Sequence, residues 1–259
     1  MPLQRIHPER GTVDPADAIS GLGWGERAPA DRPYLALNMV STTDGKAAVE
    51  GRTRAISSDT DRAIFHNLRT QVDAVMAGAG TVRTERYGPI VKTEELRQKR
   101  MREAVAPDPL AIVVSGSLNL PADVPLLQDP ESRVVILTQA QHELEGVRAN
   151  VEYLRSDAGP FDLRPLLGRL RTEYGVRSIL CEGGPTLNES LLLYGLVDEL
   201  FLTLAPTIAG GADALTIVAG QPLPELVPVE LIWVLEDAGE LYLRYGIGAR
   251  TAAPVSDTG

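Results

Sequence analysis

The sequence predicts an α/β fold: a mainly parallel sheet flanked by helices, with an antiparallel edge at its C-terminal end. Short apolar runs alternate with amphipathic segments from residue 33 to about residue 206, the pattern of strands joined by helices. Two further apolar runs within residues 231–246 follow without a helix between them, which indicates antiparallel strands. Glycine turns end several runs. Because ligands in such sheets bind beyond the carboxyl ends of strands, these turns are expected to line one crevice.

Composition narrows the class of protein. The 259 residues are 44% hydrophobic and 23% charged, as in soluble globular proteins. The net charge of −10 argues against non-specific binding to nucleic acid. No apolar stretch approaches the roughly 18 residues of a membrane span, and no secretory signal is seen, so a cytoplasmic location is expected. The single Cys181 excludes a disulfide framework, and no metal-ligand spacing is present, so no metal is expected.

The first third of the chain supplies an extension, a strand and a helix. Residues 1–31 are rich in glycine, proline and polar residues, and we expect an extended lead-in that packs on the body. Residues 33–40 (PYLALNMV) form the first predicted strand, and Asp44-Gly45 is a turn signal after it. Ser58 with Asp61 fits a capping box and predicts that a helix begins there.

The middle of the chain continues the alternation. Residues 73–80 (DAVMAGAG) form a short strand that runs into the glycine turn Gly78–Thr81, which opens a helix. The run 110–114 is a strand that ends at Ser115-Gly116. Further strands are predicted at 133–138 and 151–154, and further helices at 93–105 and 162–174.

A second strand–glycine–helix junction lies at Glu182-Gly183-Gly184-Pro185. The buried run Ile179–Cys181 precedes it, and Pro185 can occupy the first position of a helix. Glycines let the backbone approach a ligand, and a helix start offers unpaired N–H groups, so such a turn can hold a phosphate. An isolated Gly-Gly is more often purely structural. Together with Gly78–Thr81, however, it suits the two phosphate regions of a dinucleotide.

Other catalytic motifs are absent. Gly78-Ala79-Gly80 does not continue into the dinucleotide fingerprint of Rossmann folds, and no Walker A or G-x-S-x-G pattern is present. Asp44 and Glu182 are candidate proton donors, although a lone carboxylate is more often a capping or solvated group. Arg69 is either a solvent-facing helix charge or a clamp for a substrate phosphate, because guanidinium pairs with phosphate oxygens bidentately.

Three motifs in order carry a family resemblance: PYLALNMVSTTDGKAA, ISSDTDRAIFHNLRTQVDAVMAGAGTVRTERYGP and SILCEGGPTLNESLLLYGLVDELFLTLAPTIAGG. They resemble the reductase domain of the bifunctional riboflavin-biosynthesis deaminase/reductase and its stand-alone relatives, which share the dihydrofolate-reductase-like fold. The resemblance makes residues 32–247 a reductase domain. The polar composition of the last residues predicts a flexible tail at 248–259. No zinc-deaminase signature is present. The resemblance implies NADPH-dependent reduction of a ribosylated aminopyrimidine phosphate, ribose to ribityl. It also suggests a homodimer. The apolar segments 231–234 and 241–245 belong either to a subunit contact or to the core, and the core is the simpler interpretation.

The resemblance also implies site residues by their position in the motifs. The implied substrate-binding residues are Asn38, Thr53, Arg69 and Glu182. Glu182 is expected to orient the ribose hydroxyls or to supply a proton, and Asp44 to act as an acid near the substrate ring. The implied cofactor-binding residues are Val40, Gly78, Ala79, Gly80, Thr81, Val82, Glu85, Ser115, Gly183, Gly184, Pro185, Thr186 and Leu187.

Two departures from the family pattern leave the substrate open. Asn38 stands where many such reductases have lysine, and Glu85-Arg86-Tyr87 replaces an aspartate pair. Both departures resemble a stand-alone pyrimidine-reductase-like subgroup. One alternative is a reductase of dihydrofolate or of another pterin-like heterocycle on the same fold. Another is a non-catalytic module that binds NADPH. Oxidation of NADPH by a ribosylaminopyrimidine phosphate separates these hypotheses.

Overall fold

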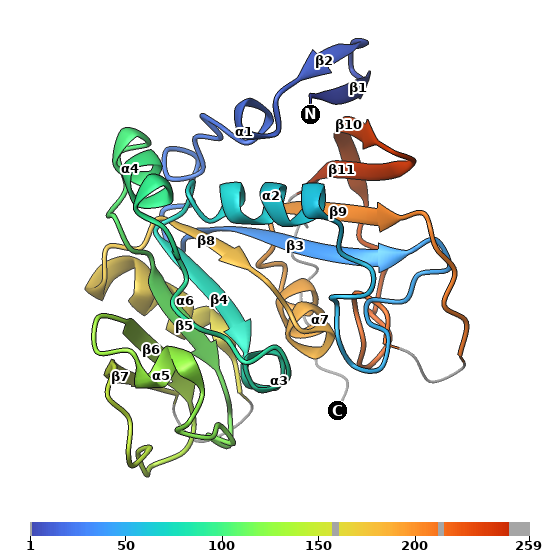
Figure 1. Ribbon diagram of the computed structural model, residues 1–259. Helices are drawn as coiled ribbons and strands as arrows, with labels where there is room; N and C mark the ends of the chain where they lie inside the picture. Colours follow the sequence, from blue (N-terminus) through green and yellow to red (C-terminus); the bar gives the residue numbers. More distant parts are fainter. Residues whose placement is uncertain (1, 157–160, 212–214, 249–259) are drawn as a thin grey trace.

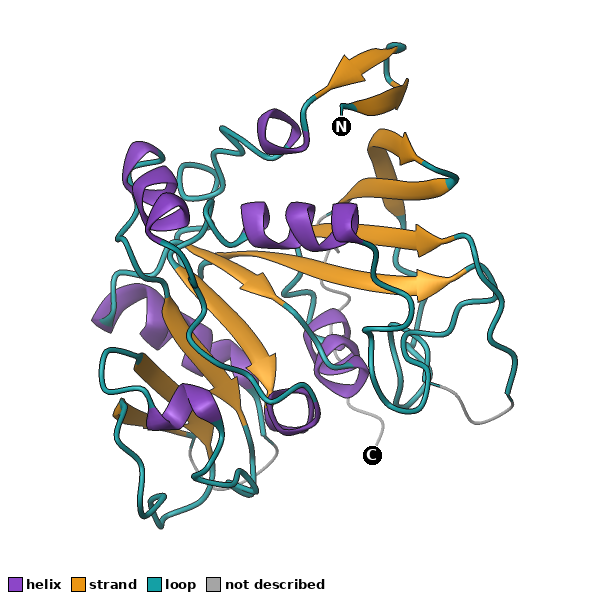
Figure 2. Ribbon diagram, in the orientation of Figure 1, coloured by secondary structure: helices purple, strands orange, loops and turns teal. Residues whose placement is uncertain are grey.

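The computed structural model describes residues 2–156, 161–211 and 215–248, and these build one 11-stranded sheet with helices on both faces (Figures 1 and 2). The strand order is β2-β1-β10-β11-β9-β3-β8-β4-β5-β6-β7. The strands are β1 (Leu3–His7), β2 (Gly11–Val13), β3 (Tyr34–Thr42), β4 (Ala74–Gly78), β5 (Leu110–Val114), β6 (Arg133–Thr138), β7 (Asn150–Arg155), β8 (Ser178–Cys181), β9 (Glu199–Ala205), β10 (Val229–Asp237) and β11 (Glu240–Ile247). The helices are α1 (Pro15–Ala18), α2 (Asp59–Leu68), α3 (Ala79–Thr84), α4 (Glu94–Arg102), α5 (Pro125–Gln128), α6 (Leu163–Glu173) and α7 (Pro185–Leu193).

The expected mixture of parallel and antiparallel pairing is confirmed. Parallel pairing joins seven neighbouring strands, in the order β9, β3, β8, β4, β5, β6 and β7. β11 pairs antiparallel with β9 on one side and with β10 on the other. The predicted alternation of strands and helices is wrong between β6 and β7. β6 and β7 are parallel neighbours, yet residues 139–149 between them contain no helix. The helix that usually makes a parallel crossover is therefore replaced by a loop.

Two apolar cores lie on opposite faces of the sheet because side chains alternate along each strand. On one face, α2 packs Ile64 and Leu68 toward Ala36 of β3 and Phe201 of β9. On the other face, α6 and α7 pack against a second set of strand residues that includes Leu35, Leu37 and Met76. The helix starts follow the sequence signals. The Ser58 hydroxyl accepts a hydrogen bond from the Asp61 N–H, and Pro185 is the first residue of α7.

The N-terminal extension is part of the sheet, which the sequence did not indicate. β1 pairs antiparallel with β10, and β2 pairs with β1 to form the outer edge. The expected packing of the extension on the body is seen at Ile19, Leu22 and Trp24, all buried in the same core as α2. The expected flexible tail lies outside the described residues, apart from Gly248.

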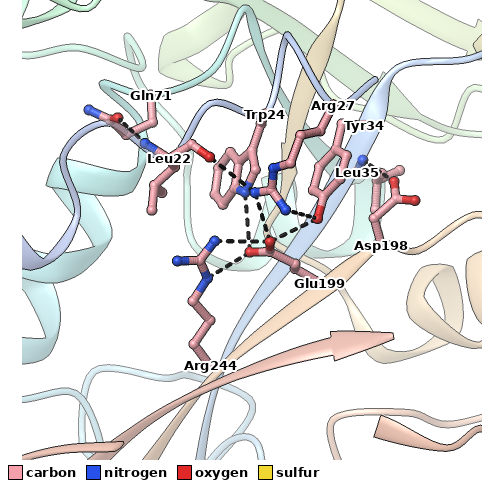
Figure 3. A network of polar contacts seen from close by, with 9 residues as sticks. All are labelled: Leu22, Trp24, Arg27, Tyr34, Leu35, Gln71, Asp198, Glu199 and Arg244. Carbon is pink, nitrogen blue, oxygen red and sulfur yellow. Dashed lines mark hydrogen bonds and ion pairs between the residues drawn. The ribbon is translucent and has the colours of Figure 1, made fainter. Parts of the chain in front are cut away.

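A buried carboxylate, Glu199 of β9, ties the extension to three strands (Figure 3). It accepts hydrogen bonds from Trp24 Nε1 at 3.1 Å, Arg27 Nη2 at 2.9 Å and the Tyr34 hydroxyl at 2.8 Å. Arg244 of β11 donates from Nε and Nη2 at 2.8 and 2.9 Å. Residues from the extension, β3, β9 and β11 thus contact the same carboxylate.

No helix among the described residues has the length and apolar character that a membrane span requires.

Candidate active site

The two glycine turns meet at the carboxyl ends of neighbouring parallel strands, as expected. β8 lies beside β4, and the Gly78 N–H donates to the Gly183 carbonyl at 2.7 Å. A Cβ atom at Gly184 would lie 2.8 Å from Thr81 Oγ1, closer than real Cβ contacts come. Gly183 has φ +80°, and a Cβ there would lie 3.2 Å from the sulfur of Met39. Glycine is therefore required at both positions for the turns to come together.

Beside the paired turns is a cavity of about 540 Å³. Seven of the residues predicted from sequence line it: Asn38, Val40, Thr53, Arg69, Thr81, Glu85 and Glu182. They come from β3, the loop before α2, the end of α2, the helix α3 and its C-terminal end, and the end of β8. Chain segments more than 100 residues apart thus form one wall, with Thr81 and Glu182 bordering both the glycine turns and the cavity.

The remaining predicted cofactor residues surround the turns rather than line the cavity. The side chains of Ala79, Val82 and Leu187 are buried in the two cores, so only their backbone groups can face a ligand. Gly80 and Thr186 are exposed. The other predicted positions lie at or next to the carboxyl ends of β4, β5 and β8: Gly78, Ser115, Gly183, Gly184 and Pro185.

Asp44 lies in the loop after β3 and is not among the residues that line the cavity. Its carboxylate accepts hydrogen bonds from Thr42 Oγ1 at 2.5 Å, from the Ala209 N–H at 3.1 Å and from the Gly210 N–H at 2.8 Å. These hydrogen bonds, that from Thr42 first, lower the pKa of Asp44 to about 2. These contacts fasten the loop of residues 205–210 to the end of β3.

Glu182 and Arg69 form a buried ion pair. Arg69 Nε and Nη2 donate to the two carboxylate oxygens at 2.7 and 2.8 Å, and the side chains are 7% and 3% exposed. Arg69 also donates to the Ile90 carbonyl at 2.9 Å, and the Tyr87 hydroxyl donates to Glu182 at 2.5 Å. Burial first, then the Glu182 charge, raises the pKa of Tyr87 well above its usual value. Both carboxylate oxygens and most of the guanidinium donors are therefore committed to contacts within the chain.

Several lining residues were not found from sequence. Asp61, Phe65 and Arg69 recur every four residues along α2 and its C-terminal end, so they share the face turned to the cavity. That spacing was the available signal, but Asp61 was interpreted only as part of the capping box with Ser58. His66 also lines the cavity, and burial, followed by the charges of Arg69 and Lys92, lowers its pKa. The other lining residues are Met39, Arg54, Ser57, Arg62, Arg86, Tyr87, Gly88, Pro89 and Lys92.

Positive charge at the cavity is divided between engaged and free groups. Arg62 contacts Asp59 and the Ser57 carbonyl, and Arg86 pairs with Asp123 at 3.0 Å. Among the described residues, Arg54 and Lys92 make no hydrogen bond or ion pair, and both are exposed. These two side chains are free to meet an anion in the cavity. The described residues contain no group of three or more His, Cys, Asp and Glu side chains placed to hold a metal ion.

Comparison with known proteins identifies relatives that match most of the chain. A curated 2,5-diamino-6-ribosylamino-4(3H)-pyrimidinone 5′-phosphate reductase from Archaeoglobus fulgidus is 32% identical over 204 residues, 78% of this chain and 93% of that relative. The reductase of the same name from Methanothermobacter thermautotrophicus is 33% identical over 197 residues, 75% of this chain and 88% of that relative.

Among solved structures, a pyrimidine reductase-like protein from Corynebacterium diphtheriae aligns with TM-score 0.76 at 22% identity, over 91% of this chain and 99% of its own. This likeness confirms the fold. The RibD C-terminal domain matches residues 33–239, from the start of β3 to the turn between β10 and β11. With the paired glycine turns and the adjoining cavity, this match shows that the chain belongs to the RibD C-terminal domain family.

Proposed function

We propose that this protein is an NADPH-dependent oxidoreductase that reduces the ribose of a ribosylated aminopyrimidine 5′-phosphate to a ribityl chain. The observation that carries the proposal is the hydrogen bond between Gly78 and Gly183. It brings together the two glycine turns that could bind phosphates, beside a cavity large enough for a substrate. The names of the archaeal relatives support the same reaction. A cytoplasmic location, expected from the sequence, belongs to this proposal.

The glycine turns fit the pyrophosphate of a dinucleotide. α7 begins at Pro185, and its N-cap Gly184 provides no side chain to cap the first N–H groups. Those groups stay available for an anion, as at other helix starts that bind phosphates. A side chain at Gly184 would collide with Thr81, so the backbone there remains bare. The bound cofactor would supply the hydride accepted by ribose C1′, and Thr81 and Val40 at the cavity wall would face it.

The two unpaired basic side chains at the cavity suggest where the substrate phosphate binds. Arg69 was the sequence candidate, but its guanidinium is held by Glu182 and Ile90 inside the protein. Arg54 and Lys92 line the same cavity with no partner among the described residues. We propose that they bind the 5′-phosphate, and that Arg69 and Glu182 shape the wall behind it.

The polar groups of the wall would hold the rest of the substrate. Asn38 on β3 can both donate and accept hydrogen bonds, as an amide does. Glu85 accepts from the Thr53 N–H at 3.0 Å and from Thr53 Oγ1 at 3.2 Å, which fixes the loop before α2 against the end of α3. Asn38 on β3 and Thr53 in the loop before α2 would both contact the pyrimidine and ribose, because both line the cavity.

The test is an assay with NADPH and two substrates, the aminopyrimidine phosphate before and after deamination. We expect loss of the reduced nicotinamide absorbance and a product two hydrogens heavier, with NADPH used in preference to NADH. Arg54→Gln and Lys92→Gln should each raise KM about tenfold, the value of one charge-assisted hydrogen bond, with kcat nearly unchanged. The control is Arg133→Gln. Arg133 is the first residue of β6, at the end away from the carboxyl strand ends, and this variant should behave as wild type. Tight NADPH binding without turnover of either pyrimidine would refute the proposal.

We also propose a homodimer, built on an open face of the C-terminal strands. Leu200, Leu202 and Leu204 alternate with buried residues along β9, and their partners on β11 are Tyr245, Leu243 and Leu241. Among the described residues, Leu200 and Ile247 pack at the edge of the core beneath α6 and α7, and Leu243 is 9% exposed. An apolar sheet face of this kind is typical of a subunit contact.

Sedimentation equilibrium tests the dimer. The wild type should sediment as a dimer at micromolar concentration, and Leu202→Glu should give a folded monomer. Leu226, which is 97% exposed, offers a matched control, and Leu226→Glu should remain dimeric. A monomeric wild type would show that the open face has another purpose.

A further inference from the structure

Three carboxyl groups line the cavity, and each has different partners. Glu182 is paired with the guanidinium of Arg69, and Glu85 accepts from the backbone and hydroxyl of Thr53. Asp61 accepts from Ser57 Oγ at 2.5 Å and from the hydroxyl of Thr203. Among the described residues, Asp61 is therefore the lining carboxyl that is held by hydroxyl groups alone, without an ion pair. Hydroxyl partners can accommodate either the protonated or the ionised acid, because a hydroxyl both donates and accepts.

Asp61 lies at the inner wall of the cavity. It is in the first turn of α2, the helix that lies alongside β3 and β9 in Figure 1, and it is only 7% exposed. Thr203, its partner on β9, pairs in register with Val40 of β3, which also lines the cavity. The carboxyl thus adjoins the part of the sheet where Val40 and Asn38 meet the cavity.

The surroundings of Asp61 raise the pKa of its carboxyl group. Burial raises the pKa of Asp61 above its usual value, and the hydrogen bonds from Ser57 and Thr203 and the charge of Arg62 only partly offset this. Across the sheet face, the turn of β10 and β11 brings Glu240 close, and burial first, with the charge of Asp61 among the other causes, raises its pKa too.

The remaining charges around Asp61 are engaged elsewhere. On α2, Arg62 points to Asp59 and to the Ser57 carbonyl. On the strand turn, Asp237 accepts from Thr60 at 2.7 Å. The N-terminal end of α2 favours negative charge, which works in the opposite direction to burial. No cation contacts the Asp61 carboxyl directly among the described residues, so burial has the larger effect.

We propose that Asp61 is the catalytic acid that delivers the proton when the sugar carbon is reduced. This inference rests on the function proposed above, and it replaces both Glu182 and Asp44 as the proton donor. Glu182 has both oxygens committed to Arg69 and Tyr87, and Asp44 lies outside the cavity lining. Glu182 instead positions Arg69 and Tyr87.

The step balances as follows. The C1′–O4′ bond of the ribosylamine opens, and the proton of the attached nitrogen passes to O4′, which leaves a C1′=N double bond and a hydroxyl group. C1′ would then accept a hydride, which the bound nicotinamide dinucleotide would supply as it is oxidised. The electron pair of the double bond moves to nitrogen, which takes the proton of Asp61. The resulting carboxylate is stabilised by the Ser57 and Thr203 hydroxyls and regains a proton from water.

Asp61→Asn tests the proposal, with Asp59→Asn as its matched control. Asp59 lies in the same first turn of α2, but its side chain is 98% exposed. Asp61→Asn should lower kcat by about 10²–10⁴-fold, the usual contribution of a general acid, with KM nearly unchanged. In the wild type and in Asp59→Asn, kcat should fall as the pH rises through the pKa of the acid. In Asp61→Asn that fall should disappear.

A measurement without substrate or cofactor provides a second readout. In protein labelled with ¹³C at aspartate carboxyls, one resonance should titrate above the range of exposed aspartates and should be missing from Asp61→Asn. Asp61→Asn that keeps wild-type kcat, or that changes KM alone, would overturn the proposal, as would titration of this carboxyl in the ordinary range. A wild type inactive on both pyrimidines would instead refute the proposed function itself, and the role of Asp61 with it.

Discussion

Replacing Glu182 by glutamine should destabilise the protein strongly. The carboxylate receives two hydrogen bonds from Arg69 and one from Tyr87, and both members of the ion pair are almost fully buried. In Glu182→Gln the amide nitrogen must face a donor of Arg69 or Tyr87, and the guanidinium keeps its charge without a counter-ion. Removing one partner of a buried ion pair costs about 3–5 kcal/mol.

Urea unfolding, followed through tryptophan fluorescence, measures the change. Arg169 and Glu173 on α6 form an exposed pair with the same two-bond geometry, 2.7 and 3.0 Å, so Glu173→Gln is the matched control and should change the unfolding free energy little. Arg69→Met combined with Glu182→Gln should recover part of the loss, since no unpaired charge remains. A Glu182→Gln protein within about 1 kcal/mol of wild type would refute the reasoning, because burial would then not govern this pair.

Three further predictions concern other sites. Gly184→Ala should cost about 1–3 kcal/mol through its contact with Thr81 and should weaken NADPH binding measured by calorimetry, whereas Gly80→Ala, with open space around it, should not affect stability. Burial alone raises the pKa of Glu199, but its arginine and tyrosine partners outweigh burial and lower it. Its stabilising effect is thus full above the unfolded-state pKa and lost as pH falls through the folded one, so Glu199→Gln should flatten acid unfolding curves. Burial raises the pKa of Cys181 to about 12, so mass spectrometry should detect no alkylation at mildly alkaline pH until the protein unfolds.

Local signals were enough to predict most of the parallel half of the sheet. The apolar runs that became β3, β4 and β8 are short and end in polar or glycine turns, and each turn is at a carboxyl strand end as expected. The hairpin of β1 and β2 could not be predicted in the same way. Leu3–His7 alternates weakly, and its pairing with β10 joins residues more than 200 positions apart. No local pattern contains that information.

The site was predictable as a set of positions but not as a set of roles. The motif positions gave seven lining residues, because glycine turns and strand ends fix where the backbone passes. The ion pair of Arg69 could not be predicted because its partner, Glu182, is 113 residues away. Asp61 was seen as a helix-capping residue, and its backbone N–H does donate to Ser58. That its carboxyl turns inward depends on Thr203 and on the packing of α2 over β9.

The N-terminal hairpin has a consequence for the solubility of the chain. Without it, the nine-residue β10, which carries Leu231, Ile232, Trp233 and Val234 in succession, would be an unpaired edge of the sheet. Long apolar edges recruit strands from other molecules and lead to aggregation. β1 covers this edge and moves it outward to β2, whose three residues are too few to template another chain. A protein shortened by those strands should therefore precipitate during refolding, even if its cavity can still form.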